Sequence, residues 1–459
     1  MLWSGPSPNS HAERIDAAPW LLEHIRDGLI PQVTTTRQGQ NMRQLGYTGW
    51  RCAVLAAAAL LSLTGLVHAQ ENWTRFRGEN GVGHATQAGI PNEWTAADYE
   101  WVRELPGKGH SSPVIWGEHL FVTCGTDDGK RLLVALDPTS GGELWTHTMT
   151  LGASHLHLKN SYASGTPATD GERVYVAFAD EAHYVVKAFS FAGDELWSRD
   201  LGTFNSQHGP GVSPMVLGEY VIVANDQLGS GAILALDRKT GETMWTTQDR
   251  PFRRASYATP MLLNTAGREE LVCLCGAAGL TAHDPADGKL LWTSGELPAR
   301  TVASPVAGNG VVIGICGQGG GGVKLVAVKP GQDGQPASVA WELEKSIPYV
   351  PTPVVDGEYL YLWLDSGIVH CLNMATGETV WIERVGGKFS GSPVLVDGRL
   401  FCISEDGEVV VLAAGPEFQL LGRSPLDDES YSTPAVARGR MYLRGFNKLA
   451  CLKAAATSN

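Results

Sequence analysis

The chain has 459 residues and a formal net charge of −13 at pH 7, with 43% hydrophobic residues, 55 glycines and 14 tryptophans. A surface this acidic repels phosphate backbones, so we expect no nucleic-acid partner. The abundance of glycine and tryptophan favours short strands joined by tight turns, and a repeat fold can place this length in a single domain.

Residues 42–69 have the order of a secretory signal peptide. Arg43 and Arg51 form a positive start, the run AVLAAAALLSLTGLV at 53–67 is apolar but too short to span a bilayer comfortably, and a cleavage site of small residues ends at Ala69. A buried core helix is the alternative, although the run has no amphipathic period. We expect cleavage after Ala69 and export to the periplasm or beyond.

The residues before the apolar run indicate what precedes the signal peptide and whether it carries a lipid. Residues 1–41 are rich in Pro, Gln and Thr without a sustained hydrophobic period, so we expect a non-native or disordered upstream extension. Cys52 lies before the apolar run and not after it, so the signal is not that of a lipoprotein. The mature chain should have no transmembrane span.

From residue 70 onwards a Ser-Pro or Thr-Pro dipeptide recurs at intervals of about 40 to 54 residues. Proline has no N–H, so it suits the first position of a strand. Each dipeptide is followed by two apolar runs separated by a turn glycine, which predicts a β-hairpin. The dipeptides begin at Ser112, Thr166, Ser213, Thr259, Ser304, Thr352, Ser392 and Thr433.

A second turn follows the third predicted strand. In several units an Asp or Asn precedes a glycine by four positions, and that glycine precedes a tryptophan by four. An Asx side chain accepts hydrogen bonds from the backbone of its own turn, glycine adopts positive φ, and tryptophan adds a large apolar ring to a fourth strand. We therefore interpret these acids as turn formers and not as catalytic acids. They are Asp137, Asp237, Asp284 and Asn373, followed by Trp145, Trp245, Trp292 and Trp381.

Four strands in each of eight units predict an all-β fold, a single eight-bladed β-propeller of four-stranded antiparallel blades over residues 70–455. The last unit ends soon after its third strand, near Leu452. We expect its fourth strand at about 99–105, where Trp101 lies upstream of the first Ser-Pro. Pairing of these two segments would close the ring into one domain.

These motifs, together with the lead-in WTRFRGENGVG at 73–83, resemble the pyrroloquinoline-quinone (PQQ) repeat family over about residues 73–452. For one branch, the quinoprotein dehydrogenases, the resemblance implies a bound quinone, calcium and an Asp base. The other branch contains non-catalytic periplasmic scaffolds of the BamB type. The adjacent Cys-Cys pair of the alcohol dehydrogenases is absent, since one residue separates Cys273 from Cys275, and little chain remains for catalytic insertions. The chain is therefore closer to the BamB-type branch, although it lacks the lipid-bearing cysteine of BamB.

The residues before each Ser/Thr-Pro should converge on one face, because the first strand of each blade lines the central channel. Aromatic and imidazole rings there could stack on a flat ligand or hold the end of a peptide; alternatively, they only plug a wide channel. The predicted binding residues of this channel mouth are His110, Asn160, Tyr162, Gln207, His208, Tyr257, Tyr349 and Tyr431, and Phe389 belongs to the same set of rings.

Two further groups could carry chemistry. His155 and His157 have a spacing that suits a metal ion, and with His110 and His208 they could form a cluster; a solvated loop is the alternative, and we predict no metal site. Seven cysteines follow Ala69, an odd number that excludes complete pairing, and in apolar runs each acts as a small hydrophobe.

The sequence thus predicts an exported binding or scaffold protein, a monomer without a cofactor, that uses one face of the propeller to hold a protein or peptide partner in the envelope. A PQQ-dependent oxidoreductase with calcium is the alternative, and a sensor of a small ligand is a third hypothesis.

Overall fold

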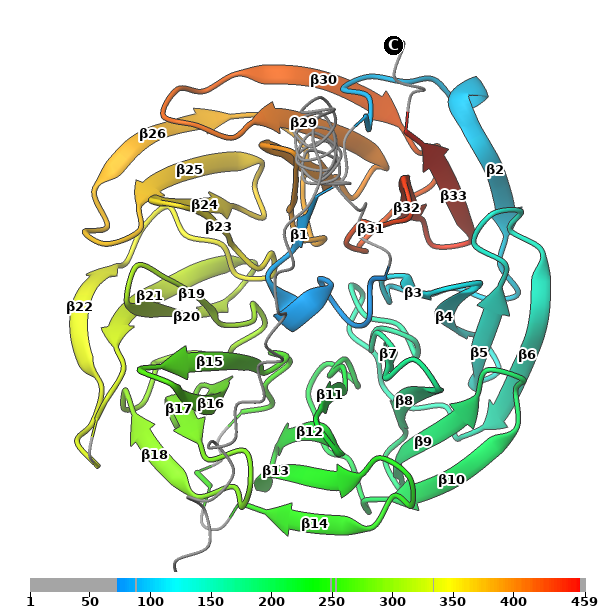
Figure 1. Ribbon diagram of the computed structural model, residues 1–459, viewed down its shortest axis with the longest axis horizontal. Helices are drawn as coiled ribbons and strands as arrows, with labels where there is room; N and C mark the ends of the chain where they lie inside the picture. Colours follow the sequence, from blue (N-terminus) through cyan, green and yellow to red (C-terminus); the bar gives the residue numbers. More distant parts are fainter. Residues whose placement is uncertain (1–71, 87–88, 248–249, 252–253, 333, 455–459) are drawn as a thin grey trace, which may run out of the picture. The chain divides into compact units, whose positions relative to one another are not determined.

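The computed structural model describes residues 72–86, 89–247, 250–251, 254–332 and 334–454. The predicted signal peptide and the upstream extension lie outside them. The described residues form eight β-sheets around a common centre (Figure 1), and their only helical turns are η1 (Glu79–Gly81) and η2 (Ala96–Asp98). None of the helices in these ranges has the length and apolar character needed to cross a membrane. The prediction of an all-β, eight-bladed propeller of four-stranded antiparallel blades is confirmed.

We number blades 1 to 8 by their innermost strands in chain order. These inner strands are β3 (Val114–Trp116), β7 (Ala168–Thr169), β11 (Met215–Leu217), β15 (Met261–Thr265), β19 (Val306–Gly308), β23 (Val354–Asp356), β27 (Val394–Val396) and β31 (Ala435–Ala437). Each begins directly after the proline of a Ser/Thr-Pro dipeptide, as predicted. The second strands are β4 (His119–Gly125), β8 (Arg173–Ala179), β12 (Tyr220–Gln227), β16 (Arg268–Cys275), β20 (Val311–Gln318), β24 (Tyr359–Trp363), β28 (Arg399–Ile403) and β32 (Arg440–Arg444).

The third and fourth strands complete the blades. The third strands are β5 (Lys130–Leu136), β9 (Tyr184–Ser190), β13 (Ser230–Asp237), β17 (Gly279–His283), β21 (Gly321–Lys329), β25 (Ile368–Asn373), β29 (Glu408–Ala413) and β33 (Lys448–Lys453). The outermost strands are β6 (Glu143–Thr150), β10 (Glu195–Asp200), β14 (Thr243–Thr246), β18 (Leu290–Thr293), β22 (Ser338–Leu343), β26 (Thr379–Arg384), β30 (Leu420–Pro425) and β2 (Tyr99–Glu104). A ninth short segment, β1 (His84–Ala85), pairs in parallel with β27 and makes blade 7 five-stranded.

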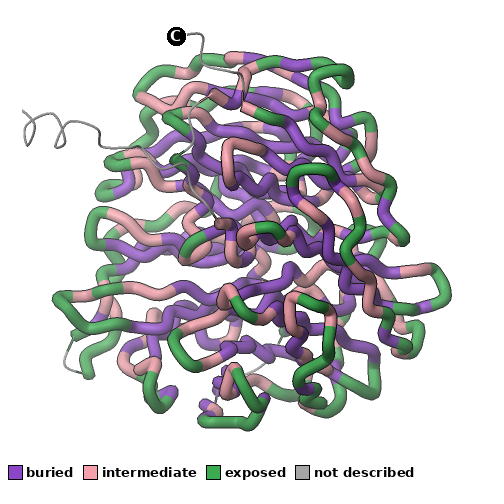
Figure 2. Tube along the Cα trace, turned by 45° about the vertical axis from the view of Figure 1, so that its right-hand side comes forward, coloured by how far each residue is buried: buried purple, intermediate pink, exposed green. Residues whose placement is uncertain are grey.

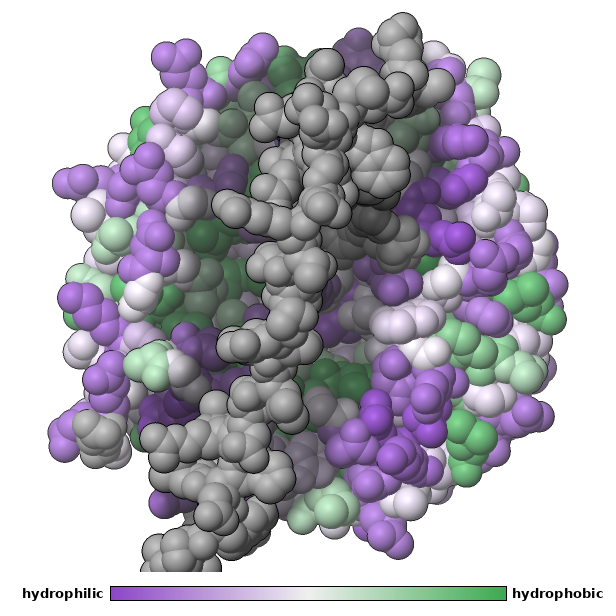
Figure 3. Space-filling model, viewed as in Figure 1, coloured by the Kyte–Doolittle hydropathy of each residue, from purple (hydrophilic) through white to green (hydrophobic). Residues whose placement is uncertain are grey.

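The core lies between the blades. The second and third strands are buried on both faces, whereas the outermost strands and the turns are exposed, as the purple and green segments of Figure 2 show. On the face drawn in Figure 3, hydrophilic residues form much of the visible periphery. All seven cysteines of the described residues are buried and unpaired, in keeping with their apolar runs.

The two ends of the propeller sequence meet in blade 8. Strand β2 pairs with β33, and Trp101 lies opposite Cys451. The Trp101 ring then packs on Gly141 of blade 1, where a Cβ atom would lie only 2.7 Å from it, and Trp101 Nε1 donates to Pro138 O at 3.2 Å. The predicted closure of the ring is therefore confirmed.

The same contact explains the glycine and the tryptophan of the repeat. The tryptophan of one blade packs on the turn glycine of the next, in the pairs Trp145–Gly193, Trp197–Gly241, Trp245–Gly288 and Trp341–Gly377. Each of these glycines has positive φ, so a side chain there would meet both backbone strain and an aromatic ring. The motif thus encodes blade-to-blade packing as well as a turn.

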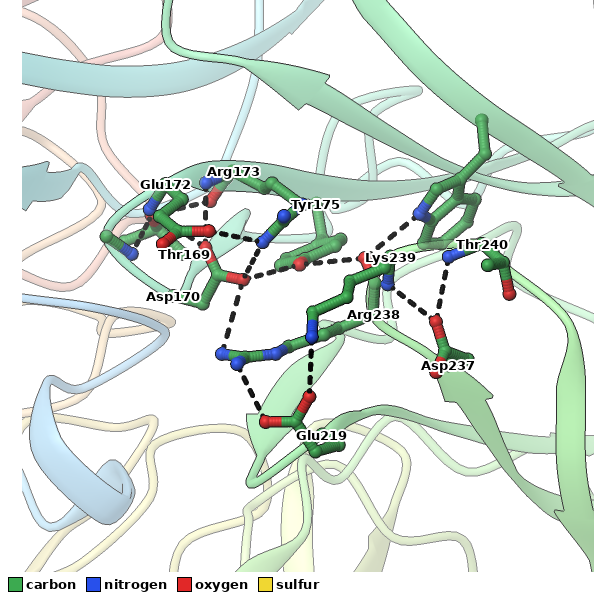
Figure 4. Close-up of polar contacts among 12 residues, drawn as sticks. Thr169, Asp170, Glu172, Arg173, Tyr175, Glu219, Asp237, Arg238, Lys239 and Thr240 are labelled. Carbon is green, nitrogen blue, oxygen red and sulfur yellow. Dashed lines mark hydrogen bonds and ion pairs between the residues drawn. The ribbon is translucent and has the colours of Figure 1, made fainter.

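The acidic residue of the motif also has the predicted role. Asp237 Oδ1 accepts hydrogen bonds from the backbone N–H of Lys239 and Thr240, both at 2.8 Å (Figure 4). Asp137, Asp284 and Asn373 accept bonds from the residue two positions on in the same way. These side chains cap turns and are not aimed at the channel.

A polar network joins blades 2 and 3 near the same turn. The Asp170 carboxylate accepts from Tyr175 Oη at 2.8 Å and from Arg173 Nη1 at 3.0 Å, and Arg238 of blade 3 pairs with Asp170 at 3.6 Å and with Glu219 at 2.7 Å (Figure 4). Burial favours a raised pKa at Asp170, but the hydrogen bonds outweigh it and lower that pKa. This carboxylate stabilises an interface between blades.

Candidate functional site: the mouth of the central channel

Hydrogen bonds link the Ser/Thr-Pro dipeptides of neighbouring blades at seven junctions around the channel. The backbone N–H of Ser112 donates to Thr166 Oγ1 at 2.9 Å, and Thr433 N donates to Ser112 Oγ at 3.2 Å between the last blade and the first. The same bond joins the pairs Thr166–Ser213, Thr259–Ser304, Ser304–Thr352, Thr352–Ser392 and Ser392–Thr433, each at 3.0 Å. We call these eight residues the hydroxyl belt. The belt explains why the residue before each proline carries a hydroxyl group.

One end of the channel is closed by residues 73–85, the lead-in segment. Its residues contact positions that follow the belt: Trp73 pairs with Ile115, and His84 Nε2 lies 2.7 Å from Val355 O. Because each inner strand runs along the channel, these contacts place the lead-in segment beyond the belt. In Figure 1 the blue ribbon that leads to β1 crosses the centre of the ring.

Two buried arginines fix the lead-in segment. Arg77 has no exposed surface and donates to Thr352 O and Pro353 O, both at 2.7 Å, and to two carbonyls of its own segment. Arg75 reaches the junction of blades 3 and 4, where it bonds Pro260 O at 2.5 Å and lies 3.4 Å from Met215 Sδ. Burial lowers the pKa of Arg75 to about 10 and that of Arg77 to about 9, so both remain charged at neutral pH.

The other end of the channel is open. A cavity of about 530 Å³ is lined by residues that precede the belt, by the belt itself and by Phe76 of the lead-in segment. Since Phe76 belongs to the closed end, the cavity is a blind pocket with one mouth.

The structure brings most of the predicted mouth residues to this cavity. Its lining includes His110, Asn160, His208, Tyr257, Tyr349 and Tyr431. Gln207 lies beside it, where its Oε1 accepts from Arg300 at 2.7 Å. Tyr162 does not line the cavity: its hydroxyl donates to Ser154 O at 2.9 Å and Arg131 lies over its ring. Phe389 is fully buried against Trp363, so its expected place at the rim is wrong.

The four histidines considered for a metal do not converge. His157 stacks on His208 with ring centroids 4.7 Å apart, whereas His110 packs against Tyr431 at 4.8 Å on another part of the wall. His155 lines a second cavity of about 420 Å³, beside Asp180 and Phe204. In the described part of the chain no three His, Cys, Asp or Glu residues form a group that could hold a metal ion.

Sequence reasoning missed three charged residues of the mouth. Arg300 Nη1 donates to His208 Nε2 at 2.7 Å and to Tyr349 Oη at 3.0 Å. Asp365 accepts from the backbone N–H of Tyr349 at 2.7 Å, and Lys159 pairs with Glu405 at 2.5 Å. Arg300 stands four positions before Ser304, in the stretch where the predicted mouth residues were rings and amides and no charged residue was predicted.

Two imidazoles of the mouth, those of His208 and His110, are neutral at physiological pH because their pKa values are lowered. Burial first, and then the charge of Arg300, lowers the pKa of His208 to about 4. Burial and the charge of Arg444 lower that of His110 to about 3. Burial raises the pKa of the Asp365 carboxyl. The mouth therefore combines the neutral rings of His110 and His208 with the Arg300 guanidinium and the Lys159–Glu405 ion pair.

The donor set does not match a quinone with calcium. Calcium is bound by six to eight oxygen ligands, several of them carboxylate. The carboxylates beside the cavity are already engaged: Asp365 caps the backbone of Tyr349 and Val350, and Glu405 pairs with Lys159 and accepts from Ser390. Two carboxylates that already have these partners do not supply the six to eight oxygen ligands of a calcium site.

Comparison with known proteins identifies the family of this chain. A family profile described as "Outer membrane protein assembly factor BamB" matches residues 128–383 and 327–415, which cover well over half of the chain. The chain belongs to this BamB family of PQQ-like propellers. The prediction of a PQQ-like repeat protein of the BamB type is confirmed.

Individual relatives are distant. Outer membrane protein assembly factor BamB of Yersinia pestis is 24% identical over 332 residues, which are 72% of this chain and 70% of that protein. A polyvinylalcohol dehydrogenase of a Pseudomonas species is 26% identical over 197 residues, 38% of this chain and 28% of that enzyme.

Solved structures share the fold. BamB from Moraxella catarrhalis has a TM-score of 0.56 at 16% identity, covering 78% of this chain and 97% of that chain. Quinohemoprotein alcohol dehydrogenase from Comamonas testosteroni has a TM-score of 0.62 at 14% identity, covering 89% of this chain and 85% of that chain. At such identities the likeness extends to architecture and not to activity.

Proposed function

We propose that this protein is a scaffold of the cell envelope that holds a segment of a protein partner in the blind pocket of its propeller. The BamB family supports an envelope role in protein assembly, since the relative from Yersinia pestis carries that description. The observation that carries the proposal is the pocket itself: about 530 Å³, closed at one end and lined by rings and hydrogen-bonding groups at the other. Such a pocket has the dimensions of a specific binding site.

The test is capture of the partner from an envelope extract by the full-length exported protein. Replacing His110, Tyr257 and Tyr431 together by Ala should reduce capture at least tenfold, because these rings supply the apolar wall of the pocket. The matched control replaces Tyr220 and Tyr359, which lie on second strands away from the cavity, and should capture as well as the unaltered protein. Unchanged capture by the triple variant would locate the interface elsewhere.

Export and oligomeric state are part of the same proposal. The protein would be cleaved after Ala69 and act as a periplasmic or secreted monomer. N-terminal sequencing of the exported protein should begin at Gln70, and sedimentation should give the mass of one chain. A mature protein that retains the apolar run at 53–67 would overturn the cleavage.

A PQQ-dependent oxidoreductase is the competing proposal, favoured by the fold likeness to the quinohemoprotein dehydrogenase. The engaged carboxylates of the mouth argue against it, and we propose that no quinone is bound. Mixing the protein with PQQ and millimolar calcium should leave both the quinone spectrum and the melting temperature unchanged. A spectral shift with thermal stabilisation would favour the enzyme. A small-ligand sensor would show stabilisation by a metabolite in place of partner capture.

A further inference from the structure

The cations that surround the channel have few acids to pair with. Arg75, Arg77 and Arg444 are each at most 5% exposed, and none forms an ion pair among the described residues. Their donors meet carbonyl oxygens, a serine hydroxyl or sulfur. The chain as a whole has a net charge of −13. The acidic surface therefore encloses three buried guanidinium groups that have no carboxylate partner in the part of the chain that the structure describes, and buried charges are screened little by salt.

Arg300 brings this positive charge to the open pocket. Its guanidinium lines the cavity and meets three neutral acceptors, His208 Nε2, Tyr349 Oη and Gln207 Oε1. None of the carboxylates in the described ranges lies within ion-pair distance of it. A carboxylate would replace neutral acceptors by shorter, charge-assisted and bidentate hydrogen bonds.

Two N–H groups at the same place lack an acceptor. Arg300 Nε and His208 Nδ1 are buried, and neither has a hydrogen-bond partner in the described part of the protein. His208 Nε2 accepts from Arg300, so the proton of the neutral ring lies on Nδ1, a tautomer assigned from this bond. Buried donors without acceptors are costly, so the mouth is short of acceptor oxygens.

The described acidic residues near the pocket do not accept hydrogen bonds from Arg300 or His208. Asp365 caps the backbone of Tyr349 and Val350, and Glu405 is held by Lys159 and Ser390. Both lie on the wall of blades 6 and 7, whereas Arg300 and His208 belong to the connections that lead into blades 5 and 3. The pocket thus has one side that attracts an anionic group.

We infer that the pocket binds the C-terminal carboxylate of a peptide segment, with Arg300 as the residue that recognises it. This rests on the proposed function and names its chemistry. The pocket is blind because Phe76 and the lead-in segment close it, so a chain end fits where a passing chain does not. Arg300 repels an N-terminal ammonium group and attracts a carboxylate, and the rings of His110, Tyr257 and Tyr431 receive the side chains that precede it.

The experiment uses the immobilised full-length exported protein and three pools of randomised tetrapeptides. The first pool has free C-terminal carboxylates, the second has amidated C-termini without acidic side chains, and the third is amidated but contains Asp or Glu. Retention of each pool is quantified by mass spectrometry. We expect the first pool to be retained at least tenfold more than the second and the third.

Substitutions of Arg300 test whether this residue recognises the carboxylate or only stabilises the fold. Arg300→Gln should reduce the preference for the free carboxylate below twofold with an unchanged melting temperature, and Arg300→Lys should retain part of it. The matched control is Arg384→Gln, which removes an exposed arginine on β26 and should keep the full preference. Equal retention of free and amidated peptides, retention of neither, or an unchanged preference in Arg300→Gln would overturn the inference. Equal retention of the first and third pools would show carboxylate recognition without the chain end and would also overturn it.

Capture from the envelope extract distinguishes this inference from the proposed function. If Arg300→Gln captures the same partner as the unaltered protein, while the triple variant of His110, Tyr257 and Tyr431 does not, the scaffold function stands and the carboxylate is not the recognised group. If neither variant changes capture, the pocket is not the interface and the proposed function fails with it.

Discussion

The two ends of the channel use the same residue type in opposite ways. At the closed end, Arg77 is fully buried and directs its donors to four backbone carbonyls, including Thr352 O and Pro353 O. At the open end, Arg300 meets only neutral side chains, and its Nε has no acceptor among the described residues. Both are guanidinium groups without a carboxylate partner, yet only one is satisfied.

This difference distinguishes an arginine that stabilises the fold from an arginine that can bind a ligand. A buried cation whose donors all meet fixed carbonyl groups contributes to folding and has no capacity left for a ligand. A cation beside a cavity, held by side chains that can rotate, can exchange its partners for a ligand without unfolding the backbone. We therefore assign stabilisation to the lead-in segment and recognition to the mouth.

The largest expected effect tests the closed end. Arg77→Met removes the donors of four carbonyls and leaves Thr352 O and Pro353 O buried without a donor, so the free energy of unfolding should fall by about 2 to 5 kcal/mol. Denaturant unfolding followed by tryptophan fluorescence measures this change. The matched variant Arg300→Met should cost less than about 1 kcal/mol, because its partners remain accessible to water from the cavity. Similar losses in both variants would contradict the comparison between the two ends.

A pH experiment sharpens the description of the open end. His110 packs between Tyr431 and Phe446 with Arg444 behind it, and its pKa falls from 6.5 to about 3. Below pH 6.5 the unfolded chain takes up a proton that the folded protein refuses until about pH 3. The stability is thus fully present above pH 6.5 and is lost as the pH falls through this window.

His110→Phe keeps a ring in this place and removes the titration. Between pH 7 and pH 4 the unaltered protein should lose up to about 3 kcal/mol more stability than the variant. His208 and His283, whose pKa values burial also lowers to about 4, remain in both proteins, so the slope decreases but does not vanish. Identical slopes in a series of unfolding curves would mean that His110 has the same pKa in the folded and the unfolded state.

The propeller was predictable because its determinants are local and repeated. Proline at the first strand position, the Asx turn and the glycine–tryptophan spacing each act within one or two blades. Trp101 indicated the closure because it lies upstream of the first Ser-Pro, while the last unit has no fourth strand of its own. The contact between each tryptophan ring and the turn glycine of the next blade was not predictable, because the motif does not indicate which neighbouring turn the ring packs against.

The mouth was predictable only in part. Rings that precede the prolines, such as Tyr257 and Tyr349, line the cavity because the inner strands fix that position. Phe389 and Tyr162 follow the same pattern, but Phe389 is buried against Trp363 and Tyr162 packs on Arg131 outside the cavity. Side-chain packing decides these positions, and sequence spacing does not encode it. Arg300 was not predicted because a single arginine in a loop usually faces solvent. Only the structure shows that it lines the cavity without an ion-pair partner among the described residues.

The smallest expected effect lies between the two ends, in the hydroxyl belt. Thr166→Val keeps the shape of the side chain but removes the acceptor of the Ser112 N–H group, which is buried. The loss should be about 1 to 2 kcal/mol, the cost of one unsatisfied buried donor. Thr150→Val, an exposed position on β6, is the control and should change the stability by less than about 0.5 kcal/mol. Thr166 also lines the cavity, so this comparison uses stability and not peptide retention. Equal losses of stability in Thr166→Val and Thr150→Val would mean that the belt bond does not stabilise the junction between blades 1 and 2.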